Sequence, residues 1–198
     1  MNPLKNWHSD TSAAPLAVYR ICFGLLMLFS TIRFISKGWV SSLYIEPKFH
    51  FSYQGFDWLP YPSEAVIWML FVTLIATSIF ITLGLLYRSA TILFFISFSY
   101  IELLDKANYL NHYYFVTLIA FLLIFTSTHR TFSLDRYFGL FKGSFYAKLW
   151  EIRILQFQIA VVYIFAGIAK IETDWLLNAK PFRYCLHTAN HSSVFGDL

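Results

Sequence analysis

Long apolar segments alternate with short polar ones along the chain. The apolar segments cover residues 14–35, 63–87, 89–104, 108–126 and 150–171. A helix needs about 20 mostly apolar residues to cross a bilayer, and all but the third segment approach or exceed that length. Only helices and closed barrels satisfy the backbone inside lipid. The pattern therefore predicts an all-α fold, a polytopic transmembrane helical bundle with about five spans.

Residues 36–62 break this pattern, because charged residues and prolines are mixed there with many aromatic rings. Aromatic residues gather at the boundary between membrane and water, where ring faces are apolar and ring tips are hydrated. We therefore expect an interfacial aromatic-rich loop, a lid or re-entrant segment on the membrane face. His50 lies in this loop and is a candidate functional residue, although a lone histidine is more often structural. The rings are those of Trp39, Tyr44, Phe49, Phe51, Tyr53, Phe56, Trp58 and Tyr61.

The stretch from Leu103 to Tyr114 places polar and ionisable residues between two apolar segments. At about 1.5 Å per residue, segment 89–104 is shorter than the roughly 30 Å hydrocarbon core, so Lys106 is expected below the headgroups. Ionisable groups at that depth are costly and mark functional sites, and a desolvated lysine becomes a usable base. The alternative is a hydrated loop whose lysine extends to the headgroups. The polar residues are Asp105, Lys106, Asn108, Tyr109, Asn111 and His112.

The distribution of polar residues divides the chain into three parts. Residues 1–13 form a polar lead, in which Asp10, Thr11 and Ser12 are candidate caps for the first helix. Residues 14–175 form the membrane domain, and residues 176–198 form a tail without a long apolar run. Arg20 lies inside the first apolar segment, and we expect its long side chain to extend to the interface.

The composition agrees with a membrane location, because 58% of the 198 residues are apolar and only 13% are charged. Soluble domains are typically about 45–50% apolar and about 25% charged. The net charge is +4, but the basic residues are scattered among apolar segments. This distribution indicates contact with the anionic headgroups of the lipid bilayer and argues against nucleic-acid binding. The two distant cysteines and the separated histidines predict neither a disulfide nor a metal site.

The basic residues also bear on orientation. Lys and Arg near the connections divide almost evenly between the two sides of a five-span arrangement. Residues 130–148 form the most compact basic connection, and such connections favour the cytoplasm. This would place the N-terminus on the cytoplasmic side of the membrane and the Lys106 hairpin on the non-cytoplasmic side. No cleavage site of small residues follows the N-terminus, so the first apolar segment is expected to act as the insertion signal.

The polar stretch from Leu103 to Tyr114 also contains a recognisable sequence motif. The order of residues from Leu103 to His112, LLDKANYLNH, resembles that of the vitamin K-dependent gamma-glutamyl carboxylases. Residues 83–88 resemble the short turn of that family, and residues 158–175 resemble a later segment, in matching order and spacing. The chain is identified as a member of the wider family of horizontally transferred transmembrane domain (HTTM) proteins. The resemblance implies a multi-pass protein of a bacterial inner membrane.

The resemblance implies a chemistry that accounts for the unusual lysine. In these carboxylases a lysine deprotonates reduced vitamin K, which then reacts with oxygen to give a strong base. That base removes the gamma proton of a glutamate in a protein or peptide substrate, and carbon dioxide adds. By resemblance Lys106 is the initiating base, and because a hydroquinone has a pKa of about 10, the lysine must be neutral in a dry pocket. Asp105 must then point to another partner, such as Asn108 or Lys170.

The resemblance assigns further roles near this lysine. Asn111 and His112 match the motif and are expected to orient the quinone oxygens or to stabilise an oxyanion. Their alternative role is capping and packing at the start of a helix. The catalytic candidates are therefore Lys106, His50 and His112, and the candidates for binding reduced vitamin K or a related quinol are Asn111, Tyr109, Tyr113 and Asp105.

Two alternatives to a complete carboxylase remain. Carboxylases of the family carry a long soluble region after the membrane part, whereas this sequence stops at Leu198, so the tail is expected to be the truncated start of such a region. The chain is then a fragment or a reduced enzyme. The other alternative is a non-catalytic module that binds a quinone or lipid, or a partner in the maturation of, or immunity to, a secreted peptide. A transporter is less consistent, because paired inverted halves are lacking.

Overall fold

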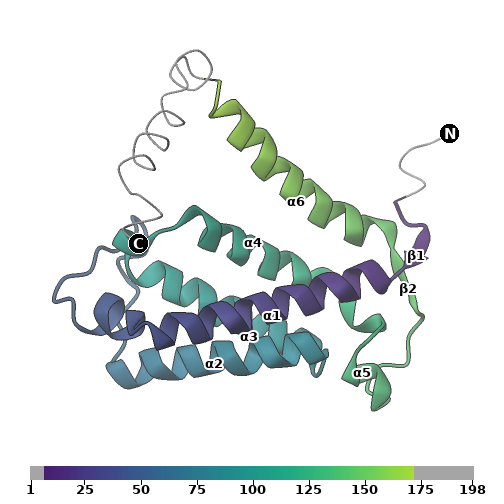
Figure 1. Ribbon diagram of the computed structural model, residues 1–198, viewed down its shortest axis with the longest axis horizontal. Helices are drawn as coiled ribbons and strands as arrows, with labels where there is room; N and C mark the ends of the chain where they lie inside the picture. Colours follow the sequence, from purple (N-terminus) through teal and green to yellow (C-terminus); the bar gives the residue numbers. More distant parts are fainter. Residues whose placement is uncertain (1–6, 172–198) are drawn as a thin grey trace, which may run out of the picture. The chain divides into compact units, whose positions relative to one another are not determined.

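The computed structural model describes residues 7–171, which fall into two compact units that divide after Leu155. The long helices are α1 (Ala14–Ser36), α2 (Glu64–Leu83), α3 (Tyr87–Leu104), α4 (Asn111–Phe125) and α6 (Leu149–Ile168), shown in Figure 1. They match the predicted apolar segments to within a few residues, so the prediction of an all-α bundle is confirmed. The predicted tail at residues 176–198 lies outside the described residues.

Length and composition distinguish these helices. Among residues 7–171, α1, α2 and α6 are each long and apolar enough to cross a membrane, and α4 is a shorter apolar helix. The 18 residues of α3 begin with Tyr87 and Arg88 and include Glu102. The chain is therefore a helical membrane protein in which three of the five expected segments qualify as spans on their own.

Several short elements connect the helices of the first unit. Strand β1 (Asp10–Ser12) pairs antiparallel with β2 (Tyr146–Lys148), so the polar lead is joined to the connection between α4 and α6. Residues 10–12 were expected to cap α1, but Ala13 occupies the N-cap position. The remaining elements are the π-helix η2 (Ser41–Ile45), the 3-10 helices η3 (Lys106–Asn108) and η4 (Thr128–Arg130), and α5 (Leu134–Tyr137).

The core of the first unit lies between its four long helices. α1 packs on α2, α2 on α3, and α3 on α4. Phe23 of α1 also meets Phe94 of α3 edge to face, with ring centroids 5.6 Å apart. A Cβ added to Gly24 would lie 2.3 Å from the Thr82 hydroxyl, so this glycine lets α1 and α2 approach closely. Small residues at crossings are the usual means of tight helix packing in membranes.

The turn between α2 and α3 is stabilised by residues far away in the sequence. Gly84 ends α2 with φ +64°, and the Asp135 carboxylate accepts hydrogen bonds from the N–H groups of Leu86 at 2.7 Å and Tyr87 at 3.0 Å. Arg20 is fully buried, with its guanidinium against Gly84 and donating to the Phe132 carbonyl at 2.5 Å. The expectation that Arg20 extends to the interface is therefore wrong.

We predict that Gly84→Ala destabilises the first unit more than Gly139→Ala does. Both glycines have positive φ, but a Cβ at Gly84 would lie 1.5 Å from the Arg20 guanidinium, whereas Gly139 has open space. Strain at positive φ costs about 1–2 kcal/mol, and displacing the buried cation should bring the loss at Gly84 to about 3 kcal/mol or more. Equilibrium unfolding in detergent micelles measures the free energy of unfolding of both variants. Equal losses at the two positions would contradict a packing role for Gly84.

Candidate functional site

The site is built around the Asp105 side chain, which is only 6% exposed. Asp105 follows the last residue of α3, where the backbone changes to an extended conformation. Its Oδ1 accepts from the N–H groups of Phe51 at 3.2 Å and Ala107 at 2.9 Å, and its Oδ2 lies 3.2 Å from His50 Nδ1. One carboxylate thus fixes both the turn after α3 and the loop before α2. A carboxylate that accepts several hydrogen bonds is well compensated for its burial.

Further contacts bind the aromatic loop to this end of the helices. The Lys106 N–H donates to the Phe51 carbonyl at 2.7 Å. The His50 ring stacks on Tyr61 with centroids 3.6 Å apart, and the Tyr61 hydroxyl donates to the Tyr44 carbonyl at 2.6 Å. Burial, and to a smaller extent the Asp105 charge, raises the pKa of Tyr61 to about 12. Tyr61 therefore remains a neutral hydrogen-bond donor at physiological pH.

The predicted site residues divide into two groups. His50 and Asp105 meet directly, and Asp105 points away from Lys106 as expected, although the Asn108 amide donates to the Leu43 carbonyl and not to Asp105. By contrast, the side chain of Lys106 is exposed on η3. Within the described residues, Lys106 is therefore not enclosed in a pocket. Its expected depth in the membrane was inferred from the length of one segment and stays a prediction. Asn111 and His112, in the first turn of α4, are exposed as well.

Tyr109 and Tyr113 line cavities at this end of the first unit. The Trp39 cavity has a volume of about 450 Å³ and the Tyr53 cavity about 460 Å³, and Tyr109 contributes to both. These volumes fall in the range of about 300–1,000 Å³ typical of small-molecule sites. The Trp39 cavity is lined by Phe34, Trp39, Ser42, Leu43, Tyr44, Ala107, Asn108, Tyr109, Leu110 and Tyr113, and the Tyr53 cavity by Tyr53, Ser99, Glu102, Leu103, Tyr109, Tyr114 and Thr117.

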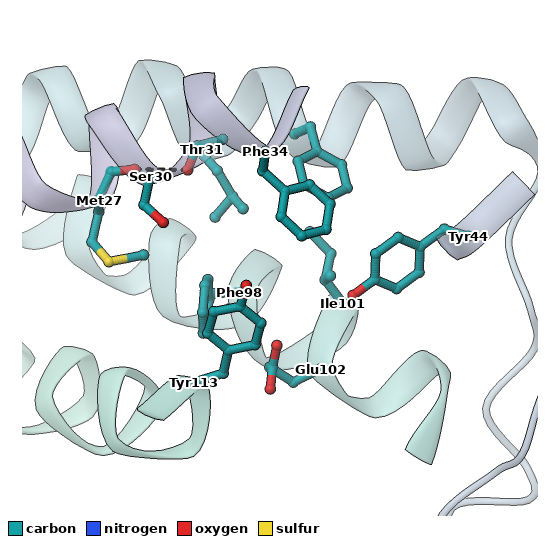
Figure 2. A pocket seen from close by; sticks show the side chains of 11 residues that line it. Met27, Ser30, Thr31, Phe34, Tyr44, Phe98, Ile101, Glu102 and Tyr113 are labelled. Atoms are coloured by element: carbon teal, nitrogen blue, oxygen red, sulfur yellow. Dashed lines mark hydrogen bonds between the residues drawn. The ribbon is translucent and has the colours of Figure 1, made fainter. Parts of the chain in front are cut away.

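A third, smaller cavity of about 40 Å³ is lined by residues of α1, α2, α3, α4 and η2 (Figure 2). We call it the central cavity. It shares Phe34, Tyr44 and Tyr113 with the Trp39 cavity and Glu102 with the Tyr53 cavity. Figure 2 shows the Glu102 carboxylate and the Tyr113 ring pointing into this space. The polar end of the bundle is therefore hollowed on several sides of the Asp105 turn.

Glu102 is the functional candidate that the sequence prediction omitted. It lies one turn before Lys106, and the structure places it on the walls of two cavities. Its position four residues before Lys106 on an apolar helix was the available signal. Tyr44 and Tyr53 belong to the predicted aromatic loop, but no pattern in the sequence indicated that their rings meet α3 and α4.

A comparison with known families supports the resemblance on which these roles were based. A family model for the HTTM domain matches residues 8–198. The chain belongs to the HTTM domain family. This domain is the membrane domain characteristic of vitamin K-dependent gamma-glutamyl carboxylase-like proteins. No solved structure matches the chain. In this HTTM domain, the carboxylase-like signature thus coincides with the Asp105 turn and the cavities beside it.

We predict that Asp105→Ala loosens both segments held by the carboxylate. Loss of charge-assisted hydrogen bonds worth about 1.5–3 kcal/mol each should speed amide exchange at Phe51 and Ala107 by about 10-fold or more. Hydrogen exchange in detergent measures this, with amides in the middle of α2 as an internal reference. Asp57→Ala is the matched control, because within residues 7–171 that carboxylate accepts only from the exposed Ser52 hydroxyl. Unchanged exchange at Phe51 would contradict the central position of Asp105.

Proposed function

We propose that this HTTM domain is the membrane core of a quinol-dependent enzyme of the gamma-glutamyl carboxylase type. The observation that supports it best is the pair of cavities of about 450 and 460 Å³ that share Tyr109. Tyr109 belongs to the carboxylase-like signature between Leu103 and His112. A largely apolar pocket with a few convergent polar groups is the usual form of a cofactor site.

The lining of the Tyr53 cavity suits reduced vitamin K or a related quinol. Such a molecule has a flat apolar ring system with two hydroxyl groups. The cavity offers the aromatic rings of Tyr53, Tyr109 and Tyr114, and the hydroxyl groups of Ser99 and Thr117. Aromatic pairs gain from offset or edge contacts, so a bicyclic ring would fit between these tyrosines. We assign the quinol to this cavity, with Tyr109 as the wall it shares with the Trp39 cavity.

Within this proposal the residues of the Asp105 turn have separate roles. When bound, the quinol would supply, together with oxygen, the strong base that removes the gamma proton of a substrate glutamate before carbon dioxide adds. Lys106 would take the first hydroxyl proton, for which its long flexible stem must turn from solvent towards Tyr109. Asp105 is engaged by His50 and Phe51, so it does not hold the Lys106 ammonium in an ion pair. His50 positions Asp105 in this scheme.

The proposed surroundings are the lipid bilayer and a glutamate-containing protein or peptide substrate. Phe49, Phe51 and Trp58 are strongly exposed on the aromatic loop. Exposed rings of this kind are stable at the headgroup level. The loop would therefore lie at the membrane surface, next to the turn that carries Lys106, and a peptide could reach the turn from the aqueous side.

A non-catalytic role is the second candidate, and the exposure of Lys106 and His112 favours it. The same cavities would then bind a quinone or a lipid without activating it. Such a module would act in the maturation of a secreted peptide or in immunity to it. The two candidates differ in whether Lys106 matters for anything beyond stability.

We predict that the purified protein in detergent converts reduced vitamin K to the epoxide in the presence of oxygen. Lys106→Ala should lower this rate by about 100-fold or more, because positioned bases contribute about 10²–10⁴-fold. Lys142→Ala removes one exposed lysine from the connection before β2 and should leave the rate unchanged. Product analysis by chromatography measures the rate of epoxide formation by the unaltered protein and by the two variants. Quinol binding without epoxide formation by the unaltered protein would favour the non-catalytic module.

We further propose that the Lys106 turn faces the non-cytoplasmic side of a bacterial inner membrane. In a protein whose Cys22 and Cys185 are replaced by serine, a cysteine introduced by Lys106→Cys should react with an impermeant maleimide added to spheroplasts. A cysteine introduced by Lys142→Cys should react only after the membrane is opened. Both positions are readily modified in principle, because both side chains are exposed. The opposite labelling pattern would overturn this orientation.

A further inference from the structure

The Glu102 carboxylate differs from the other acid at this corner of the domain. Asp105 is occupied by His50 and by two backbone N–H groups. Within residues 7–171, no hydrogen bond or ion pair joins the Glu102 carboxylate to another residue, although this side chain is half-buried. Leaving a partly buried carboxylate without a partner costs free energy, and such groups in apolar surroundings are generally kept for function.

The position of Glu102 indicates what it faces. It is the one residue common to the central cavity and the Tyr53 cavity. Figure 2 shows its carboxylate beside Tyr113 at the central cavity, and Glu102 is the residue at which the lining of that cavity joins the lining of the Tyr53 cavity. The other residues that line the Tyr53 cavity are tyrosines, Ser99, Leu103 and Thr117, none of which has a carboxyl or amino group on its side chain. A ligand in that cavity would therefore meet a single carboxyl group.

The hydrogen-bonding chemistry of a carboxylate determines which ligand that group favours. An ionised carboxylate only accepts hydrogen bonds. The hydroxyl groups of a quinol donate, whereas the carbonyl groups of the oxidised quinone only accept and would bring two electron-rich oxygens together. Hydrogen bonds to an ionised partner are also about twice as strong as neutral ones.

We propose that Glu102 accepts a hydrogen bond from a hydroxyl group of the bound quinol, and so makes the site select the reduced over the oxidised form. This inference rests on the proposed quinol-binding function and adds a specificity residue to it. Glu102 is a binding group in this scheme. Because a carboxylate is a far weaker base than a hydroquinone anion, it would keep the proton shared and leave proton transfer to Lys106.

The test compares binding of reduced and oxidised menadione to the purified domain under anaerobic conditions. Quenching of tryptophan fluorescence gives both dissociation constants. The unaltered protein should bind the reduced form about 10-fold more tightly or better, because a hydrogen bond to a charged group is worth about that factor. In Glu102→Gln the amide can donate to the quinone carbonyl, so the ratio should fall to about 1 or reverse.

Two further variants keep this test decisive. Glu64→Gln, in the first turn of α2, removes an exposed carboxylate far along the chain from the cavity and should leave the ratio unchanged. Glu102→Asp retains the charge and should retain a preference for the reduced form, even if Glu102→Gln proves unstable. Unchanged selectivity in Glu102→Gln, or lost selectivity in a folded Glu102→Asp, would overturn the role of Glu102. Failure of the unaltered protein to bind either form would instead overturn the proposed function.

Discussion

The buried carboxylate of Asp105 is the interaction on which the geometry of the candidate site depends. It is the point where α3 ends, where η3 begins, and where the aromatic loop returns to the helices. All three connections use backbone N–H groups or His50, so they do not depend on the identity of the surrounding apolar residues. Because the turn is fixed in this way, the cavities on either side of Tyr109 keep defined walls. Strong hydrogen bonds to one charge thus replace the packing that a short turn cannot provide.

Much of the fold followed from hydropathy because each helix satisfies its own backbone in lipid. The positions of α1 and α2, for example, depend on local composition and on the proline and serine residues at their starts. The same reasoning failed for Arg20, since its partners at Gly84 and Phe132 lie far away in the sequence. A one-dimensional pattern cannot distinguish a cation that reaches the interface from one that packs against a distant turn.

The candidate site was predictable only in part, again because contacts between residues far apart in the sequence leave no local pattern. The motif located the turn and identified Asp105 and Lys106, but the depth of Lys106 was inferred from the length of a segment. The structure shows that none of the residues of the short helix η3, which follows Asp105, is buried. His50 could be connected to Asp105 only through tertiary structure, because 55 residues separate them. Glu102 was recognisable as a polar residue, but the absence of a partner is a property of the folded protein.

The contacts of Asp135 and Phe132 also constrain how the domain is made. The carboxylate that caps the turn between α2 and α3 lies 49 positions after Leu86, and the carbonyl to which Arg20 donates lies 112 positions after Arg20. During synthesis, α1, α2 and α3 therefore leave the ribosome before their stabilising partners exist. Arg20 and the start of α3 therefore lack these partners until residues 132–135 have been synthesised. Late residues thus complete helices that are made early, at the end of the first unit near Gly84.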